Sequence, residues 1–249
     1  MKDDRRKPLL VAATVREAGL FIGHWGPGGK GRWAREARYY RWEGDRNLPF
    51  LLAVTGIGPG LSRVGLEQAL DDSGEISSVV GFGFAGGLAK SGKRGDLVIP
   101  TQVLFEKMSL TPTEWLRMAL AARSEASAWR NLITVDQVIE SPAEKAALYA
   151  ATDAEAVDME AGVWGRVCQE RKIPWAVVRA VLDPADQVLP HEFTRIIDGF
   201  GHLRLGKTLS LFLSRPSLIR SALRQTGGSL ARLAEPQMKL LAGWVRAEK

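Results

Sequence analysis

Residues 8–17, PLLVAATVRE, contain the pattern that decides the fold. The apolar run 8–14 predicts a buried strand, and the apolar spacing over 15–22 predicts that a helix follows it directly. This alternation recurs, so we expect an α/β fold, a three-layer αβα sandwich around a central mixed sheet. The further expected strands are 49–55, 76–82, 96–100, 156–159 and 175–182, and the further expected helices are 61–72, one that begins at Pro142 with Ser141 as N-cap, and 160–171.

Two segments depart from this alternation. Residues 24–46 contain GPGGKG and an aromatic, basic stretch, and we expect an irregular insert there. From His191 onward the chain is expected to be mostly helical, because apolar residues recur three or four positions apart. No linker divides the chain, so residues 1–190 are expected to form the main body and 191–249 a helical extension of the same domain. The apolar row of this extension is Phe193, Ile196, Ile197, Phe200 and Leu203.

The net charge of the chain lies in that extension. Residues 191–249 hold 10 Lys and Arg against 4 Asp and Glu, which accounts for the whole net charge of +6. Such a segment can contact an anionic membrane or remain a solvated face. It lacks the interleaved aromatic residues of nucleic-acid binding, so we expect no nucleic-acid partner.

The rest of the composition points to an ordinary intracellular domain. The single Cys168 cannot form an internal disulfide and is predicted to be a buried structural thiol. The three histidines have no metal-like spacing, so no metal site is expected. The charged start MKDDRRKP is followed by too short an apolar run for a signal peptide or a membrane span, which predicts a cytoplasmic location.

Three carboxylates stand at the ends of predicted strands: Glu17, Glu160 and Asp183. Because strand-end loops carry the sites of α/β folds, we expect the three side chains to meet in one site. A plainer interpretation makes Glu17 and Glu160 helix-start carboxylates favoured by the helix dipole, and Asp183 a turn residue. Arg179 lies inside an apolar strand and is costly to bury unless it is paired, so its plainer interpretation is a structural ion pair.

Six short motifs occur in an order that resembles a known family. None of them is decisive alone. Together they resemble the nucleoside phosphorylase family, and their pattern is most similar to the methylthioadenosine/S-adenosylhomocysteine nucleosidases. The resemblance spans residues 8–186 and implies a purine nucleoside phosphorylase-like fold, cleavage of a purine N-glycosidic bond and a homodimer. The motifs are ATVRE (13–17), TGIG (55–58), GFAGGL (83–88), GD (95–96), VDMEA (157–161) and VRAVLD (178–183).

The resemblance assigns roles to matching positions. Cleavage passes through a cationic, oxocarbenium-like ribose and needs an acid at purine N7. Asp183 is expected to be that acid. Glu160 is expected to bind the ribose hydroxyls, with Met159 packed against the sugar, and Glu17 and Arg179 are expected to position the attacking water. The remaining residues expected to bind substrate are Phe84, Gly86, Val138 and Ile139, and no cofactor is implied.

Three positions depart from the family pattern. Leu182 and Phe84 stand where serine is common, and Val138 stands where an aromatic residue often stacks on the purine. A more apolar pocket tends to raise the pKa of Asp183, which suits an acid that works near neutral pH.

The nucleophile is expected to be water, with phosphate as co-substrate the alternative. The Arg and Ser that some phosphorylases use for phosphate are Gly81 and Phe84 in this chain. Arg63 is a possible substitute, although its plainer interpretation is an exposed helix residue.

The end of the chain narrows the resemblance. DPADQVLP (183–190), the basic tail and LSRP (213–216) resemble the hopanoid-associated phosphorylases. That branch implies adenosylhopane as substrate, with an apolar 5′ group, and the basic tail as a peripheral contact with an anionic membrane. The plainer interpretation of the tail is a helix packed on its own core. Other substrates left open are methylthioadenosine, S-adenosylhomocysteine and futalosine, and a non-catalytic nucleoside- or lipid-binding module is the alternative from another class.

Overall fold

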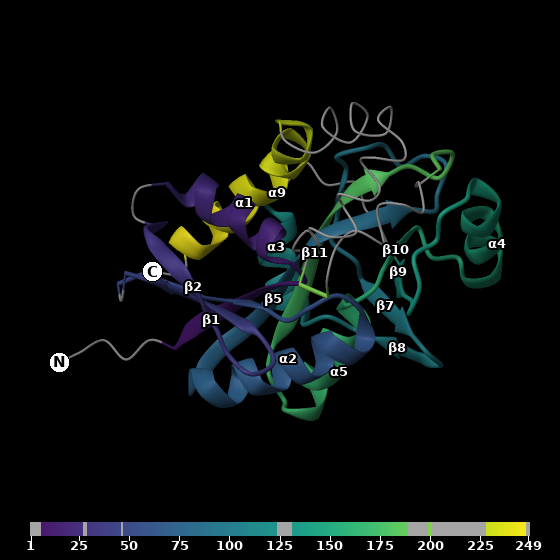
Figure 1. Ribbon diagram of the computed structural model, residues 1–249. Helices are drawn as coiled ribbons and strands as arrows, with labels where there is room; N and C mark the ends of the chain where they lie inside the picture. Colours follow the sequence, from purple (N-terminus) through teal and green to yellow (C-terminus); the bar gives the residue numbers. More distant parts are fainter. Residues whose placement is uncertain are drawn as a thin grey trace, which may run out of the picture.

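The computed structural model describes residues 6–26, 29–45, 47–123, 131–188, 199–200 and 228–247 (Figure 1). The strands are β1 (Lys7–Ala12), β2 (Gly31–Arg35), β3 (Tyr40–Gly44), β4 (Leu51–Val54), β5 (Ile76–Gly87), β6 (Leu97–Val98), β7 (Gln102–Phe105), β8 (Met108–Leu110), β9 (Asn131–Thr134), β10 (Ala156–Asp158) and β11 (Trp175–Asp183). The helices are α1 (Val15–Trp25), α2 (Gly58–Ser73), α3 (Glu114–Ala121), α4 (Pro142–Thr152), α5 (Ala161–Glu170) and α9 (Gly228–Ala247).

The described strands form one mixed sheet. Its order is β2-β3-β4-β1-β5-β10-β9-β7-β8, and β11 pairs with β5 and β6. The central strands β4, β1, β5 and β11 are parallel to one another, whereas β10 is antiparallel to β5. The predicted central mixed sheet is therefore confirmed.

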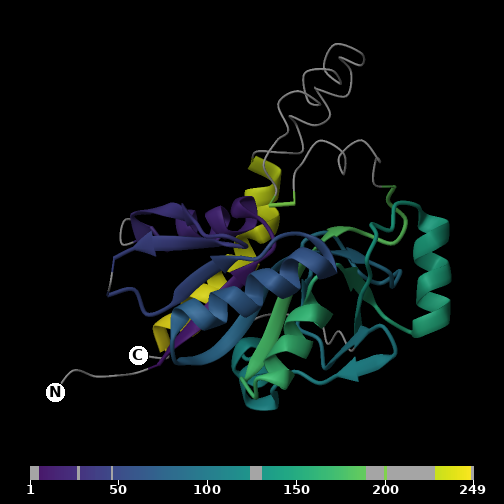
Figure 2. The same ribbon diagram turned by 60° about the horizontal axis from the view of Figure 1, so that its bottom comes forward.

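Helices cover both faces of this sheet. Alternate residues of β1 point to opposite sides, so Leu9 and Val11 join one apolar cluster and Leu10 and Ala12 another. The first cluster packs against α2 and α5 and includes the buried Cys168. The second packs against α1, α3 and α9, which gives the predicted three layers (Figures 1 and 2).

The expected irregular insert is wrong for most of residues 24–46. The segment forms the hairpin β2–β3, and β3 pairs with β4 to extend the sheet. Trp33 and Trp42 lie directly opposite each other, with ring centroids 4.9 Å apart, and such cross-strand aromatic pairs stabilise a hairpin. Because these two strands are half-exposed, they lack the continuous apolar run that marked the central strands.

Helix α9 confirms a helical C-terminal extension for residues 228–247, and its apolar side is part of the core. Leu241, Trp244 and Val245 are buried in the same cluster as α1 and α3. The Gln237 amide nitrogen donates to the carbonyls of Gly83 and Val178, at 2.9 and 2.7 Å. Of the predicted apolar row, Phe193, Ile196, Ile197 and Leu203 lie outside the described residues, while the Phe200 ring packs 5.1 Å from the Tyr40 ring.

Deletion of residues 228–249 is expected to abolish cooperative folding. Each large apolar side chain that α9 buries contributes about 1.5–3 kcal/mol, and several together equal the net stability of a typical domain. Thermal unfolding followed by circular dichroism measures this. The control is Lys239→Ala, at an exposed position on α9, whose free energy of unfolding should lie within about 0.5 kcal/mol of that of the unmodified chain. A deleted chain that still unfolds in one sharp transition near the same temperature would contradict this packing.

None of the helices that the structure describes combines the length and the apolar character needed to cross a lipid bilayer.

Candidate active site

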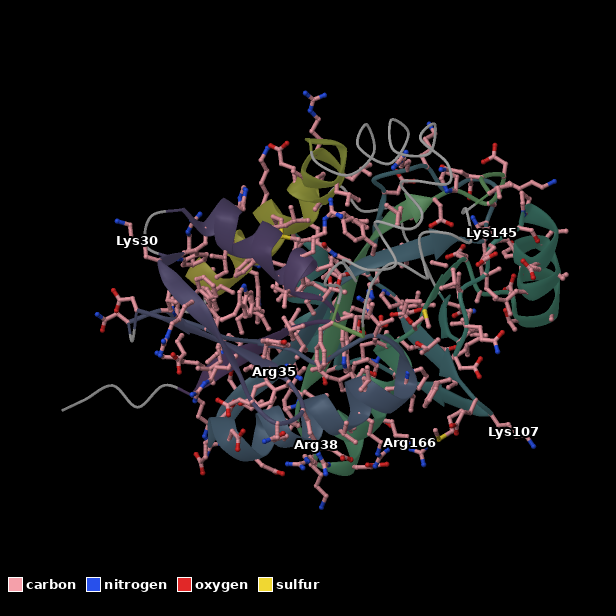
Figure 3. The ribbon with its side chains drawn as sticks, viewed as in Figure 1. Lys30, Arg35, Arg38, Lys107, Lys145 and Arg166 are labelled. Carbon is pink, nitrogen blue, oxygen red and sulfur yellow. The ribbon has the colours of Figure 1, made fainter. Side chains whose placement is uncertain are left out.

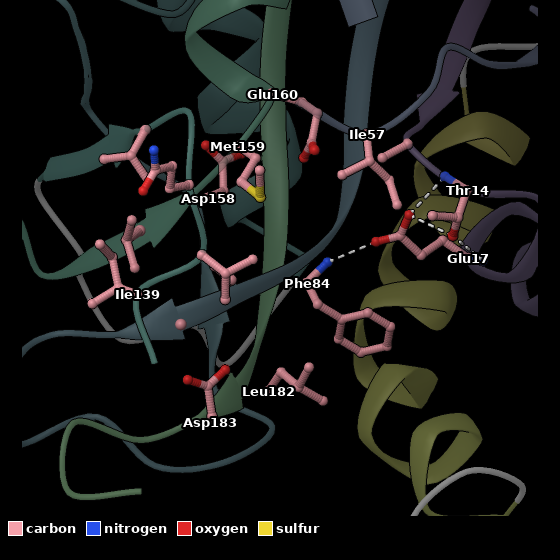
Figure 4. A pocket seen from close by; sticks show the side chains of 17 residues that line it. Thr14, Glu17, Ile57, Phe84, Ile139, Asp158, Met159, Glu160, Leu182 and Asp183 are labelled. Carbon is pink, nitrogen blue, oxygen red and sulfur yellow. Dashed lines mark hydrogen bonds between the residues drawn. The ribbon is translucent and has the colours of Figure 1, made fainter. Parts of the chain in front are cut away.

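A pocket of about 210 Å³ opens among the ends of β1, β10 and β11 and the segment that follows β9 (Figure 4). It brings together every predicted site residue except Arg179. Those residues are Glu17, Phe84, Gly86, Val138, Ile139, Met159, Glu160 and Asp183. The other residues that line the pocket include Thr14, Ile57, Gln137, Asp158 and Leu182.

Glu17 reaches the pocket from the first turn of α1. It completes a capping box with Thr14: its Oε2 accepts from the Thr14 backbone N at 3.0 Å, and its own N donates to Thr14 Oγ1 at 3.2 Å. Its Oε1 accepts from the backbone N of Phe84 at 3.2 Å (Figure 4). The plainer role as a helix-start carboxylate is therefore present, and the same side chain lines the pocket. Burial raises its pKa, and the Arg179 charge opposes that rise.

Gly83 makes this arrangement possible. Its φ of +144° is unfavourable for residues with a side chain, and a Cβ atom there would collide with the Glu17 carboxylate and the Arg179 guanidinium. The position before Phe84 must therefore be glycine for Glu17 to reach the backbone of β5.

Arg179 lies behind the pocket wall. It is fully buried, forms an ion pair with Asp158, and has one guanidinium nitrogen 3.5 Å from Glu160 Oε2. It also donates to the Phe82 carbonyl at 3.0 Å and lies 4.8 Å from the Trp164 ring centroid. The ion pair that its burial required is present, so Arg179 can act on a bound molecule only through its carboxylate neighbours.

Glu160 stands at the start of α5 with 6% of its surface exposed. Its Oε1 accepts from the backbone N of Gly58 at 3.0 Å, a hydrogen bond that joins the start of α5 to the start of α2. Burial raises its pKa well above the usual range, with Arg179 opposing and the Asp158 and Glu17 charges adding to the rise. A buried carboxylate of this kind is suited to accept hydrogen bonds from a ligand's hydroxyls.

Asp183 ends β11 and lies away from Glu160 across the pocket (Figure 4). It is 2% exposed, beside Leu182 and opposite Gly86 on β5, whose missing side chain leaves room for the carboxyl. Its Oδ2 accepts from the Lys145 ammonium at 2.6 Å. Burial raises the pKa of Asp183 to about 6, and the Lys145 hydrogen bond and charge act against that rise.

The pocket is thus divided electrostatically. One part presents Glu17, Asp158 and Glu160, and another presents Asp183 among apolar neighbours. Among the residues that line it, all within the described part of the chain, there is no lysine or arginine. The described residues also contain no group of three or more His, Cys, Asp or Glu side chains that could hold a metal ion. Such a pocket favours a ligand that carries or develops positive charge.

The comparisons with known proteins agree with this fold. The sequence pattern described as "Phosphorylase superfamily" matches residues 9–128 and 130–201, and the chain belongs to this superfamily. The 5′-methylthioadenosine/S-adenosylhomocysteine nucleosidase of Buchnera aphidicola is 26% identical over 162 residues, which cover 56% of this chain and 64% of that relative.

Solved structures show the same fold. The 5′-methylthioadenosine/S-adenosylhomocysteine nucleosidase of Helicobacter pylori with butyl-thio-DADMe-Immucillin-A has a TM-score of 0.71 at 19% identity, covering 98% of this chain and 100% of that one. The Neisseria meningitidis nucleosidase with methylthio-immucillin-A has a TM-score of 0.70 at 19% identity, covering 97% and 99%. Futalosine hydrolase of Helicobacter pylori has a TM-score of 0.64 at 20% identity, covering 73% and 86%.

The roles of two charged residues of this site, Asp158 and Lys145, are not evident from the sequence. Asp158 lies within the motif VDMEA, so its position was noted, but its pairing with Arg179 was not predicted. Lys145 gave no signal, because a lysine in the first turn of a short helix is usually solvent-exposed.

Proposed function

We propose that this chain is a purine nucleosidase that cleaves the N-glycosidic bond of a 5′-substituted adenosine and releases adenine. The observation that carries the proposal is the divided pocket. Glu17, Asp158 and Glu160 favour a ribose that becomes cationic. Asp183 lies apart from them and can be protonated, which favours a purine that must gain a proton at N7 as it leaves. The relative that is 26% identical is named for methylthioadenosine and S-adenosylhomocysteine, two 5′-substituted adenosines, and this supports the proposal.

In this proposal Glu160 binds the ribose hydroxyls and Glu17 positions the nucleophile. Arg179 acts behind them by holding Asp158 and Glu160 in place, rather than by contacting water itself. Met159 packs against the sugar, and Val138 and Ile139 lie beside the purine. No cofactor enters the reaction.

Several contacts favour water over phosphate as nucleophile. A Cβ atom at Gly81 would lie 2.5 Å from the Trp164 ring, so no arginine fits at the position where some phosphorylases have one. Arg63 is 39% exposed and is held by Glu67 and Glu170 through ion pairs of 3.0 and 2.9 Å. The charged side chains that line the pocket, all in the described part of the chain, are carboxylates, which disfavour an anionic nucleophile.

The test is adenine release from methylthioadenosine with and without phosphate, with the sugar product identified by mass spectrometry. Water as nucleophile predicts a free sugar and a rate that does not depend on phosphate. A sugar 1-phosphate formed in proportion to adenine would establish phosphorolysis in its place.

The 5′ group is proposed to be apolar, and adenosylhopane is the specific substrate proposed. Ile57, Phe84 and Leu182 give the pocket an apolar wall, which supports a hydrocarbon substituent over a charged one. Comparing kcat/KM for adenosylhopane in detergent micelles with the values for methylthioadenosine, S-adenosylhomocysteine and futalosine tests this. A higher value for any of the three soluble nucleosides would replace the adenosylhopane assignment.

We also propose that the chain acts as a homodimer. A separate proposal is that residues 191–227 contact an anionic membrane. The membrane proposal rests on the basic residues of that segment, each worth about 1 kcal/mol near an anionic surface. Because α9 is part of the core, the test replaces Arg195, Arg204 and Lys207 with glutamine instead of deleting the tail. Binding to anionic vesicles at low salt, lost at high salt and in the substituted chain, is expected; equal binding to neutral vesicles would contradict it.

A further inference from the structure

Helix α4 attaches to the molecule in an unusual way. A surface helix ordinarily buries a stripe of apolar residues. On α4 the residue that is fully buried is Lys145, while its other side chains are exposed or half-buried. Figure 3 shows Lys145 where α4 meets the body of the molecule, in contrast to the outward Lys107. A buried ammonium is costly unless each of its protons has an acceptor.

All three Lys145 protons have acceptors, one at the end of β11 and two in the loop that follows it. Nζ donates to Asp183 Oδ2 at 2.6 Å, to the Pro184 carbonyl at 2.8 Å and to the Gln187 carbonyl at 2.9 Å. An ammonium has three donors, so this set is complete. The side chains of Lys145 and Asp183 are 0% and 3% exposed.

These contacts join two walls of the pocket. The segment that leads into α4 contains Gln137, Val138 and Ile139, which line the pocket, and α4 itself begins at a capping box between Ser141 and Glu144. The second wall is the end of β11, which contains Leu182 and Asp183. Lys145 therefore fixes the distance between the wall expected to face the purine and the carboxyl expected to protonate it.

We propose that Lys145 is a positioning residue for the reaction: it holds the Asp183 carboxyl by one oxygen and ties the wall after β9 to the end of β11. This inference rests on the proposed function, because the acid role of Asp183 belongs to that function.

The electrostatic consequence has a definite sign. Burial raises the pKa of Asp183 to about 6, while Lys145 and, more weakly, Arg94 favour its charged form. The other charged groups that line the pocket are the carboxylates Glu17, Asp158 and Glu160, contributed by α1, β10 and the start of α5. Removing the Lys145 cation destabilises the Asp183 carboxylate, so the proton stays bound to higher pH. An adjacent opposite charge typically shifts a carboxyl pKa by about 1–3 units.

The experiment measures kcat/KM for adenine release from methylthioadenosine against pH in Lys145→Met, with Lys90→Met, a substitution of an exposed lysine, as matched control. In the unmodified chain the alkaline limb is expected near pH 6. In Lys145→Met it is expected to move upward by about 1–2 pH units, with a loss of about tenfold in kcat at pH 6 from poorer alignment. The control should show the unmodified profile. A folded Lys145→Met with an unmoved limb would overturn the proposal, as would an unchanged kcat.

Lys145→Gln provides a second variant if the methionine variant does not fold, because its amide still donates to the carbonyls of Pro184 and Gln187. The same upward shift is expected. A readout without catalysis separates this inference from the proposed function: in the unmodified chain the Lys145 side-chain ¹⁵N signal should shift in step with the Asp183 ¹³Cγ titration near pH 6. Independent titration of the two signals would overturn the positioning role, whereas lack of adenine release with coupled signals would overturn only the proposed function.

Discussion

Asp183→Asn is expected to lower kcat for adenine release by about a hundred- to ten-thousand-fold while nucleoside affinity stays within a few-fold. The amide can still accept a hydrogen bond from Lys145, but it cannot transfer a proton to purine N7, and general acid catalysis is typically worth this range. Stopped-time assays of adenine and equilibrium binding of the nucleoside measure the two quantities separately.

The matched control is Asp186→Asn, an exposed aspartate three positions further along the same loop. Its activity should equal that of the unmodified chain. If Asp183→Asn keeps its activity within about threefold of the unmodified chain, Asp183 is not the acid.

Glu160→Gln is expected to lower turnover by about a hundredfold or more and, at the same time, to stabilise the fold. Burial raises the pKa of Glu160, but a sugar that becomes cationic favours its charged form, and a charged acceptor holds two hydroxyls more strongly than an amide does. The fall in turnover should exceed any loss of affinity for free adenine. Equal losses of both would place the residue at the base instead.

The stability gain follows from the burial of Glu160. Because its pKa is raised in the fold, the folded chain holds this proton at pH values where the unfolded chain has lost it. Stability therefore falls as pH rises from about 4.3 toward the raised value, and glutamine has no such dependence. We expect the variant to gain about 1 kcal/mol at pH 8, or about 2–4 °C in Tm, and less at pH 5.

Thermal melts at both pH values check this, with Glu75→Gln, an exposed carboxylate, as control. A variant less stable than the unmodified chain at pH 8 would show that the Arg179 contact outweighs the cost of burial.

The sequence predicted the central strands because they are buried on both faces, which produces continuous apolar runs such as 8–14. Their order also placed three carboxylates at strand ends, and the structure brings these into one pocket. The hairpin β2–β3 could not be predicted in this way. Its strands are half-exposed, and their pairing depends on the edge that β4 offers.

The charged contacts behind the pocket depend on distant parts of the chain. Arg179 lies on β11 and Asp158 on β10, and both strands pair with β5. The two residues are 21 positions apart in the sequence. Lys145 donates to acceptors 38 to 42 positions away, at the end of β11 and in the loop after it. Local periodicity predicts that Lys145 lies in a short helix. It cannot predict the buried oxygen atoms that accept its hydrogen bonds. Only the assembled sheet brings these partners together.

Adenine release by the purified chain at pH 6, without phosphate, from methylthioadenosine and from adenosylhopane tests directly whether this pocket is catalytic. We expect free adenine in equal amount to free sugar from at least one of the two nucleosides, and we expect Asp183→Asn to lose this activity. Nucleoside binding without adenine release above the rate of Asp183→Asn would contradict it, and would show that the pocket belongs to a non-catalytic nucleoside-binding protein.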